Sequence, residues 1–229
     1  ERKKQLNYIN IKKWDGSSLT NKILIIYSEQ GIGDNVQFAR YIKLIKKENT
    51  KIIFYTTKKL EFLFHKMIEV DEIIFNLHDV RRADYCISIM SLPYIFRFNK
   101  KLPEPYNFFQ INKEDNKFWK NKINQNKLLK VGLMWQGDSN LNKEDYKRSI
   151  PLSKFESILQ IQNIEFISLQ KDMGRKQITS NNYQNLITDF FGNIDKIPFK
   201  DTLALIENLD IIITIDTSVG HIAATLEKE

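Results

Sequence analysis

A short stretch late in the chain combines residue types that together can bind a diphosphate. An apolar, β-branched run ends at Asp216, and Thr217 and Ser218 follow it directly. The run predicts a strand buried on both faces, and either hydroxyl residue can cap a helix that begins after it. The free amides of such a helix start, with hydroxyl groups and the imidazole of His221 nearby, favour a bound anion. We therefore expect a diphosphate site in which Asp216 accepts hydrogen bonds from a ribose or from loop amides.

Two of these residues also have a plainer interpretation. Asp216 can act only as a helix cap, and a lone histidine such as His221 can be a hydrogen-bonded core residue. His221 nevertheless lies four residues after Thr217, on the helix face that carries the helix start. The ligand-binding and core interpretations of His221 therefore both stay open.

A second strand–glycine–helix unit lies near the other end of the chain, at residues 27–34. Gly31 and Gly33 permit the backbone to approach a ligand closely, and Asp34 stands where the next helix starts. A dinucleotide fingerprint would place Gly or Ala at Val36 and an acidic residue near Thr56, so a redox cofactor is disfavoured. Asp34 is either a simple cap or a carboxylate available for chemistry.

A third candidate region follows the apolar run that ends in Trp135. Gly137 permits close backbone approach there, and Trp135 offers an aromatic face. Arg148 ends the polar loop that follows, and its planar guanidinium can pair with a phosphate. The alternative for Arg148 is a solvated loop arginine.

Composition narrows the class of protein and of site. The formal net charge is +7, but the lysines are scattered, so we predict a solvated surface and no nucleic-acid partner. The alternative is attraction to phosphate-bearing substrates or a peripheral membrane contact. Three histidines, the single Cys86 and the lack of an Asp-x-Asp pair argue against a metal site or cofactor. Cys86 is expected to be a buried thiol, and the lack of a signal peptide or apolar span predicts a cytoplasmic protein.

The order of expected elements predicts an α/β fold with two Rossmann-like domains and mainly parallel sheets. The expected strands span 22–27, 51–56, 72–75, 84–90, 130–135, 165–170 and 210–215, with a short piece at 186–189. The expected helices span 34–47, 58–68, 115–123, 152–161 and 202–209, and a last helix runs from 218 to the end. We divide the chain into a lead-in (1–20), a first domain (21–110), a linker with a short helix (111–128) and a second domain (129–229).

Six motifs occur in an order that resembles the ADP-heptose heptosyltransferases of glycosyltransferase family 9. They resemble most the bacterial branch in which this domain follows tetratricopeptide repeats. The motifs cover Glu29–Tyr41, Met90–Pro93, Val131–Gly137, Arg148–Pro151, Ser168–Gln170 and Ile215–His221. The resemblance implies a GT-B fold in which the first domain binds the acceptor and the second binds the nucleotide sugar. It also implies inverting transfer without a metal.

By this resemblance, Asp34 is the general base. Asp216, Thr217, Ser218 and His221 form the nucleotide-diphosphate motif, and Arg148 matches loosely a basic residue that contacts the phosphates. The matched motifs add two glutamines, so the full set of substrate-binding candidates is Gly31, Gly33, Gln37, Trp135, Gly137, Arg148, Gln170, Asp216, Thr217, Ser218 and His221.

The implied function is transfer of a sugar, with heptose as one candidate, from a nucleoside-diphosphate donor to a glycan or protein acceptor. The chain departs from the family pattern at Ser218, where the family often has glycine, and after Leu226, where the family usually continues. The second domain is therefore expected to be incomplete. The alternative is a non-catalytic module of the same fold that binds a nucleotide sugar or an acceptor.

Overall fold

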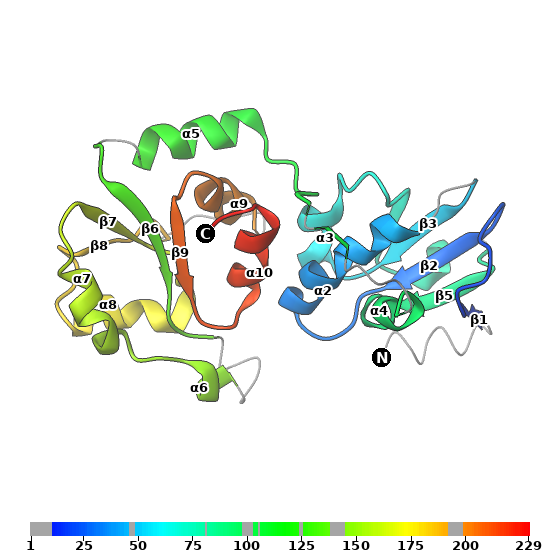
Figure 1. The fold of residues 1–229 in the computed structure, drawn as a ribbon, viewed down its shortest axis with the longest axis horizontal. Coiled ribbons are helices and arrows are strands. Elements are labelled where there is room, and N and C mark those ends of the chain that lie inside the picture. Colours follow the sequence, from blue (N-terminus) through cyan, green and yellow to red (C-terminus); the bar gives the residue numbers. More distant parts are fainter. Residues whose placement is uncertain are drawn as a thin grey trace. The chain divides into compact units, whose positions relative to one another are not determined.

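A computed structural model describes residues 11–45, 49–80, 82–97, 103–104, 106–123, 126–137, 145–191 and 199–229. The chain divides into two compact units, Glu1–Gln110 and Ile111–Glu229, which are treated separately below (Figure 1). Both units are built on a parallel sheet, so the predicted α/β fold with two mainly parallel sheets is confirmed.

Unit 1 has a five-stranded sheet with the order β1-β5-β2-β3-β4, and every pair in it is parallel. Its strands are β1 (Lys12–Lys13), β2 (Ile23–Tyr27), β3 (Lys51–Tyr55), β4 (Glu72–Ile74) and β5 (Tyr85–Ser88). The β2 and β3 strands are almost wholly buried, as their continuous apolar runs predict. Tyr27, the last residue of β2, is aligned with Ser88 of β5, so the loops after these two strands begin at the same sheet edge.

The helical segments of unit 1 are α2 (Ile32–Ala39), α3 (Lys58–Phe64) and α4 (Leu92–Ile95), with 3-10 helices η1 (Arg40–Leu44), η2 (Leu77–Asp79) and η3 (Ile89–Ser91). The helix expected at 34–47 therefore starts earlier and tightens into η1. It ends because Ile45 turns to an extended conformation (φ −73°, ψ 113°). The expected helix end at 46 and 47 lies outside the described residues.

Residues 12 and 13, in the segment expected to be a lead-in, form β1 and extend the sheet beside β5. The amide of Trp14 donates to the carbonyl of Cys86 at 2.9 Å, and the Trp14 ring packs edge-on against Phe96. Trp14 and Leu19 are both buried. This part of the segment therefore belongs to unit 1, and its polar sequence hid the strand because edge pairing uses only backbone groups.

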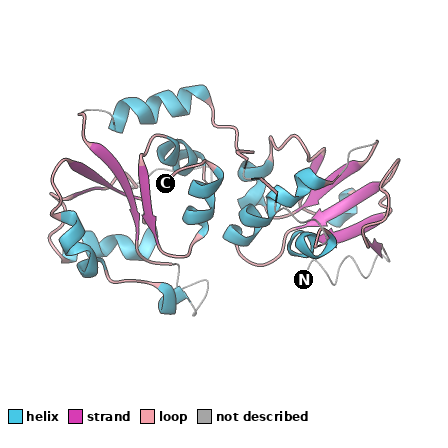
Figure 2. Cartoon of the chain, viewed as in Figure 1, coloured by secondary structure: helices cyan, strands magenta, loops and turns pink. Residues whose placement is uncertain are grey.

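Unit 2 has a four-stranded parallel sheet with the order β8-β7-β6-β9. Its strands are β6 (Leu129–Met134), β7 (Ile164–Ser168), β8 (Ile187–Thr188) and β9 (Ile211–Thr214). The helices are α5 (Lys113–Ile123), α6 (Asp145–Arg148), α7 (Glu156–Leu159), α8 (Lys176–Ser180), α9 (Lys200–Glu207) and α10 (Ser218–Thr225), with 3-10 helices η4 (Leu152–Phe155) and η5 (Asp172–Arg175). Figure 2 shows helices against both faces of this sheet, the layering of a doubly wound unit.

The short helix expected in the linker, α5, packs in unit 2 against α9. Trp119 is fully buried, and its indole Nε1 donates to Asp201 at 3.0 Å. The Nζ of Lys200 lies 2.7 Å from Asp115. A buried tryptophan with a satisfied N–H anchors the helix, so α5 is part of the unit 2 core layer.

The last helix was expected to run to the end of the chain, and this expectation is wrong. Helix α10 ends at Thr225, and Glu227 adopts a left-handed backbone (φ 58°). The amide of Lys228 then donates back to the carbonyl of Ala223 at 3.0 Å. This backward bond across a left-handed residue is the pattern that commonly closes a helix.

Candidate functional site

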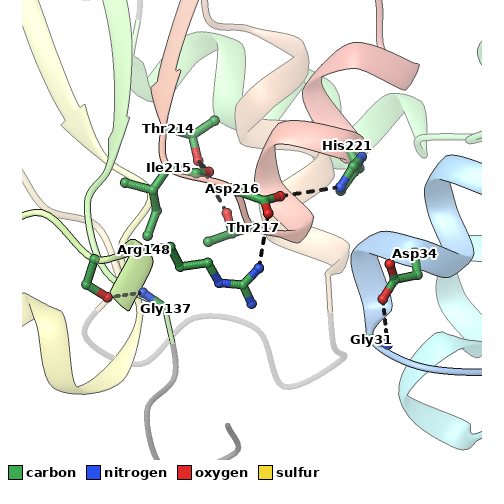
Figure 3. Close-up of polar contacts among 10 residues, drawn as sticks. Gly31, Asp34, Gly137, Arg148, Thr214, Ile215, Asp216, Thr217 and His221 are labelled. Carbon is green, nitrogen blue, oxygen red and sulfur yellow. Dashed lines mark hydrogen bonds and ion pairs between the residues drawn. The ribbon is translucent and has the colours of Figure 1, made fainter. Parts of the chain in front are cut away.

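The start of α10 is the centre of the candidate site in unit 2 (Figure 3). Thr217 occupies the N-cap position with an extended backbone (φ −142°, ψ 172°), but its side chain makes no capping bond. Its hydroxyl lies instead 3.3 Å from the hydroxyl of Thr214, the last residue of β9. The predicted strand–helix unit is confirmed, and Thr217, one of the two residues expected to cap the helix, takes the cap position, although its hydroxyl contacts Thr214 and makes no capping bond.

Two basic side chains converge on Asp216, which lies between β9 and α10 (Figure 3). The guanidinium of Arg148 donates to Asp216 at 3.3 Å, and the Nε2 of His221 lies 3.8 Å from the other carboxylate oxygen. The Asp216 side chain is 73% exposed. An exposed ion pair of this kind contributes only about 0–1 kcal/mol to stability, so its structural value is small. Its chemical consequence is that a cation and an imidazole gather at a helix start.

Two hydrogen bonds to residues just after β6 place Arg148 near Asp216, which lies far along the chain. The amide of Ile150 donates to the carbonyl of Trp135 at 2.9 Å. The amide of Gly137 donates to the hydroxyl of Ser149 at 3.2 Å. The segment after α6 is therefore bound to the end of β6, and Arg148 reaches Asp216 from there. Gly137 was expected to offer open backbone to a ligand, but its N–H already has a partner.

Trp135 does not present an aromatic face. Its ring is fully buried in the unit 2 core with Leu133, Leu152 and Phe155, and its Nε1 donates to the carbonyl of Gly174 at 3.2 Å. The expectation that Trp135 offers an aromatic face is wrong, because a buried indole with a satisfied N–H is a core residue.

Gln170 was expected to bind substrate, but the described chain uses all of its amide groups. Its Oε1 accepts from the amides of Trp135 (3.3 Å) and Gln136 (2.9 Å), and its Nε2 donates to the carbonyls of Gln136 (2.9 Å) and Lys171 (3.1 Å). A side-chain amide has two acceptor positions and two donor hydrogens, so none is left for a ligand. Gln170 is buried, and a direct binding role is wrong in this conformation.

The glycine loop of unit 1 is closed by its own side chains. A carboxylate oxygen of Asp34 accepts from the amide of Gly31 at 2.8 Å (Figure 3). The buried Asn35 amide donates to the carbonyls of Glu29 (2.9 Å) and Gly31 (2.6 Å), and Gln30 has a positive φ of 59°. Asp34 is half-buried at this helix start, so its carboxylate is held in one place. Asn35 was not predicted as part of this loop structure, because an asparagine is usually exposed and its sequence position does not indicate burial.

Glu29 and Ser88 form a hydrogen-bonded pair beside that loop that the sequence analysis also missed. The hydroxyl of Ser88 donates to the Glu29 carboxylate. Burial and the nearby Glu29 raise the pKa of Tyr27 from 10.0 to about 12. Ser88 ends the strand aligned with β2, so the predicted parallel sheet was the signal that could have found this pair.

The remaining predicted residues of unit 1 lie on α2. Gly33 and Gln37 are partly buried, while Val36 and Ala39 on another face of the helix are buried. The structure thus leaves Gly33, Asp34 and Gln37 accessible from one helix. In unit 2, Ser218 opens α10 and is also partly buried. The binding roles of these residues stay predictions.

Comparison with known proteins places this geometry in a recognised fold. A glycosyl transferase family 9 structure from Veillonella parvula has a TM-score of 0.66 at 11% identity, covering 93% of this chain and 81% of that chain. The E. coli heptosyltransferase WaaC with ADP-2-deoxy-2-fluoro heptose has a TM-score of 0.58 at 7% identity, covering 90% of this chain and 86% of that chain. The chain has the GT-B fold of the family 9 heptosyltransferases.

Likeness in sequence is weaker than likeness in this heptosyltransferase fold. Protein FlbA of Caulobacter vibrioides is 26% identical over 178 residues, which are 69% of this chain and 30% of that protein. The chain thus spans less than a third of the curated relative it matches. No family model matches the sequence.

One similar structure contains iron, so metal sites as well as membrane spans are relevant in the described residues of this chain. The iron-containing E. coli glycosyltransferase TibC has a TM-score of 0.57 at 10% identity, covering 95% of this chain and 57% of that chain. Among the described residues of this chain, no group of three or more His, Cys, Asp or Glu side chains is placed to hold a metal ion. No helix in the described part of the chain is long and apolar enough to cross a membrane.

Proposed function

We propose that this chain transfers a sugar from a nucleoside-diphosphate donor to a hydroxyl of a glycan or protein acceptor, with inversion and without a metal. The observation that carries the proposal is the convergence of Arg148 and His221 on Asp216 at the start of α10. The fold adds support, because WaaC has the same fold and is known with an ADP-heptose analogue. ADP-heptose is therefore the first donor to test, and the expected compartment is the cytoplasm.

The donor site of the proposal lies in unit 2. The start of α10 carries the positive end of the helix dipole, which favours the diphosphate. Arg148 pairs with phosphate oxygens through its guanidinium, and His221 adds a hydrogen-bond donor. Charge builds on the diphosphate as the glycosidic bond breaks, and these groups stabilise it where other enzymes use a metal. Asp216 then holds Arg148 and His221 in place or accepts a ribose hydroxyl.

The acceptor site of the proposal lies in unit 1. Asp34 takes the proton of the acceptor hydroxyl as that oxygen attacks the anomeric carbon in a single displacement. The Asp34 oxygen that accepts from Gly31 leaves the second oxygen for this proton transfer. General-base assistance of this kind contributes about 10²–10⁴-fold in rate.

The first experiment is calorimetric titration of the chain with ADP, UDP, GDP and CMP. We expect selective binding of one nucleotide, and loss of that binding in the double variant Asp216→Ala, His221→Ala. Lys176→Ala is the matched control, because it removes an exposed charge of unit 2 from α8, away from α10. Equal nucleotide affinity in the double variant and the control would contradict the proposed donor site.

A second candidate is a non-catalytic module that binds the nucleotide sugar or the acceptor. The bond between Asp34 and the Gly31 amide favours it, because that bond gives the carboxylate a structural use that needs no catalysis. Detectable transfer or donor hydrolysis that depends on Asp34 excludes the module.

A further inference from the structure

We propose that three glutamines, Gln136, Gln170 and Gln177, form a clamp that positions Arg148 for the donor phosphates. This inference rests on the proposed function, in which Arg148 binds the phosphates of the donor. It replaces the expected contact between Gln170 and substrate with a role through other residues. The clamp lies wholly in unit 2, at the ends of β6 and β7.

Gln170 holds one residue of the chain, Gln136, through both of its backbone groups. It accepts from the amide of Gln136 at 2.9 Å and donates to the carbonyl of the same residue at 2.9 Å. A primary amide can accept at its oxygen and donate from its nitrogen, which suits it to bond both backbone groups of one residue. Gln170 is 3% exposed, so these bonds are shielded from water and the Gln136 backbone is strongly held.

Gln177 connects the side chain of Gln136 to the segment that follows Arg148. Its Nε2 donates to the Oε1 of Gln136 at 2.7 Å, and its own Oε1 accepts from the amide of Leu152 at 2.8 Å. The chain of contacts therefore runs from Gln170 through Gln136 and Gln177 to the segment that follows Arg148. It is contiguous, which a positioning role requires.

The segment 149–152 is held at three points, two of them just after β6 and the third on α8. Leu152 is held by Gln177, the Ile150 amide donates to the Trp135 carbonyl at 2.9 Å, and the Ser149 hydroxyl accepts from the Gly137 amide at 3.2 Å. Arg148 directly precedes this segment and meets Asp216 at 3.3 Å. A loop fixed at three points presents a preorganised guanidinium, so less of the binding free energy is lost in ordering it.

Gly174 shows how little room the clamp allows. A Cβ at this position would lie 2.5 Å from the Cδ of Gln170, a distance that no side chain tolerates. The carbonyl of Gly174 also accepts the indole N–H of Trp135. A side chain at position 174 would therefore force Gln170 to shift.

The test is a double-mutant cycle on ADP affinity with Gln170→Met and Arg148→Ala. Methionine keeps the shape of glutamine and loses all four hydrogen bonds. We expect Gln170→Met to weaken ADP binding about tenfold in the wild-type background and less than about twofold in the Arg148→Ala background. Additive losses would overturn the clamp, because a general loss of structure would act equally in both backgrounds. Ile178→Val is the control for core destabilisation, since Ile178 directly follows Gln177 and is buried in the unit 2 core cluster, and it should leave ADP affinity unchanged.

Hydrogen exchange supplies a readout that needs no nucleotide. We expect the Ile150 and Leu152 amides to exchange faster in Gln170→Met than in wild type, while amides of β7 keep their protection. Unchanged exchange at both amides would overturn the clamp. Failure of wild type to bind any of the nucleotides, with faster exchange in Gln170→Met, would instead overturn the proposed function and leave the clamp standing as a structural device.

Discussion

The two strand–loop–helix units of this chain treat the start of their helix in opposite ways. At α2 the chain supplies its own anion, because the Asp34 carboxylate accepts from the Gly31 amide. At α10 the threonine in the cap position turns its hydroxyl to Thr214, and basic groups gather instead. One helix start thus carries a carboxylate bonded to a loop amide, and the other carries a carboxylate, Asp216, that is paired with a guanidinium and an imidazole.

The difference teaches that a helix start is not by itself a phosphate site. The positive end of the dipole favours an anion at both helices, but α2 has satisfied that preference internally. Glu29 adds a second carboxylate beside the same loop. Under the proposed function, a nucleoside diphosphate is therefore expected to bind unit 2, and Asp34 of unit 1 is expected to take a proton from a neutral hydroxyl.

The largest expected effect tests the carboxylate of unit 1. Asp34→Asn should lower turnover of a complete donor and acceptor pair by about 10²–10⁴-fold, because an amide cannot take the proton. Asparagine still accepts from the Gly31 amide, so the helix start should keep its stability. Steady-state kinetics measure the turnover. Calorimetry measures the ADP affinity, which should not change.

Glu61→Gln is the matched control for Asp34→Asn, since it neutralises an exposed carboxylate elsewhere in unit 1 that pairs with Lys58. Turnover of Asp34→Asn within about threefold of wild type would show that α2 is only capped and that the contrast has no catalytic meaning.

The next effect tests the guanidinium of unit 2. Arg148→Ala should weaken ADP binding about 10–100-fold, since a hydrogen bond between charged groups contributes about 1.5–3 kcal/mol. Arg148→Lys should recover only part of the loss, because an ammonium lacks the planar fork. Calorimetry measures both variants. The adjacent Lys147→Ala is the control, and an equal loss there would mean that net charge alone attracts the nucleotide.

A third prediction tests how rigidly unit 2 holds its site. Gly174→Ala should reduce the free energy of unfolding by about 1–3 kcal/mol, because its Cβ would overlap Gln170. Gly220→Ala should cost less, since its Cβ would lie 3.2 Å from the Cγ2 of Thr214. Urea unfolding of the two variants gives the order. The reverse order would place the tighter constraint on α10 itself.

The smallest effect tests the negative character of the unit 1 loop through Tyr27. Its pKa is raised in the folded chain from 10.0 to about 12 by burial and Glu29, so the folded state holds the proton more tightly than the unfolded state. Its contribution is fully present below pH 10 and is lost as the pH rises through about 12. Tyr27→Phe should flatten the fall in unfolding midpoint over that range. An unaltered pH profile in Tyr27→Phe would mean that Tyr27 is not the group responsible.

Local patterns predicted much of this molecule. The buried strands and the junction between β9 and α10, from Asp216 to His221, follow from runs of adjacent residues, so sequence alone placed them. Arg148 could be assigned only loosely, because it reaches Asp216 across 68 positions through hydrogen bonds of Gly137 and Ile150.

Trp135 and Gln170 show the other limit of sequence reasoning. Both stand where a strand ends at the expected ligand edge, and an aromatic ring and an amide are both common ligand contacts. Whether such a side chain turns toward the ligand or into the core depends on partners such as Gly174 and Gln136, which come from other strands and loops. Strand β1 was missed for a related reason. Lys12 and Lys13 pair with β5 through backbone groups, and two lysines give no strand pattern in the sequence.

The parallel pairing of both sheets sets the order in which the units can be completed during synthesis. Ile11 and Cys86, which are in contact, lie 75 positions apart, and Lys130 and Asp210 at the entrance to β6 and β9 lie 80 apart. Neither sheet can be completed until a strand is synthesised that lies far along the chain from the first one. The edges of the early strands stay exposed until that strand pairs with them. We expect a ribosome-bound chain that ends before β9 to leave β6 unpaired on one side, and so to depend on chaperones more than its size suggests.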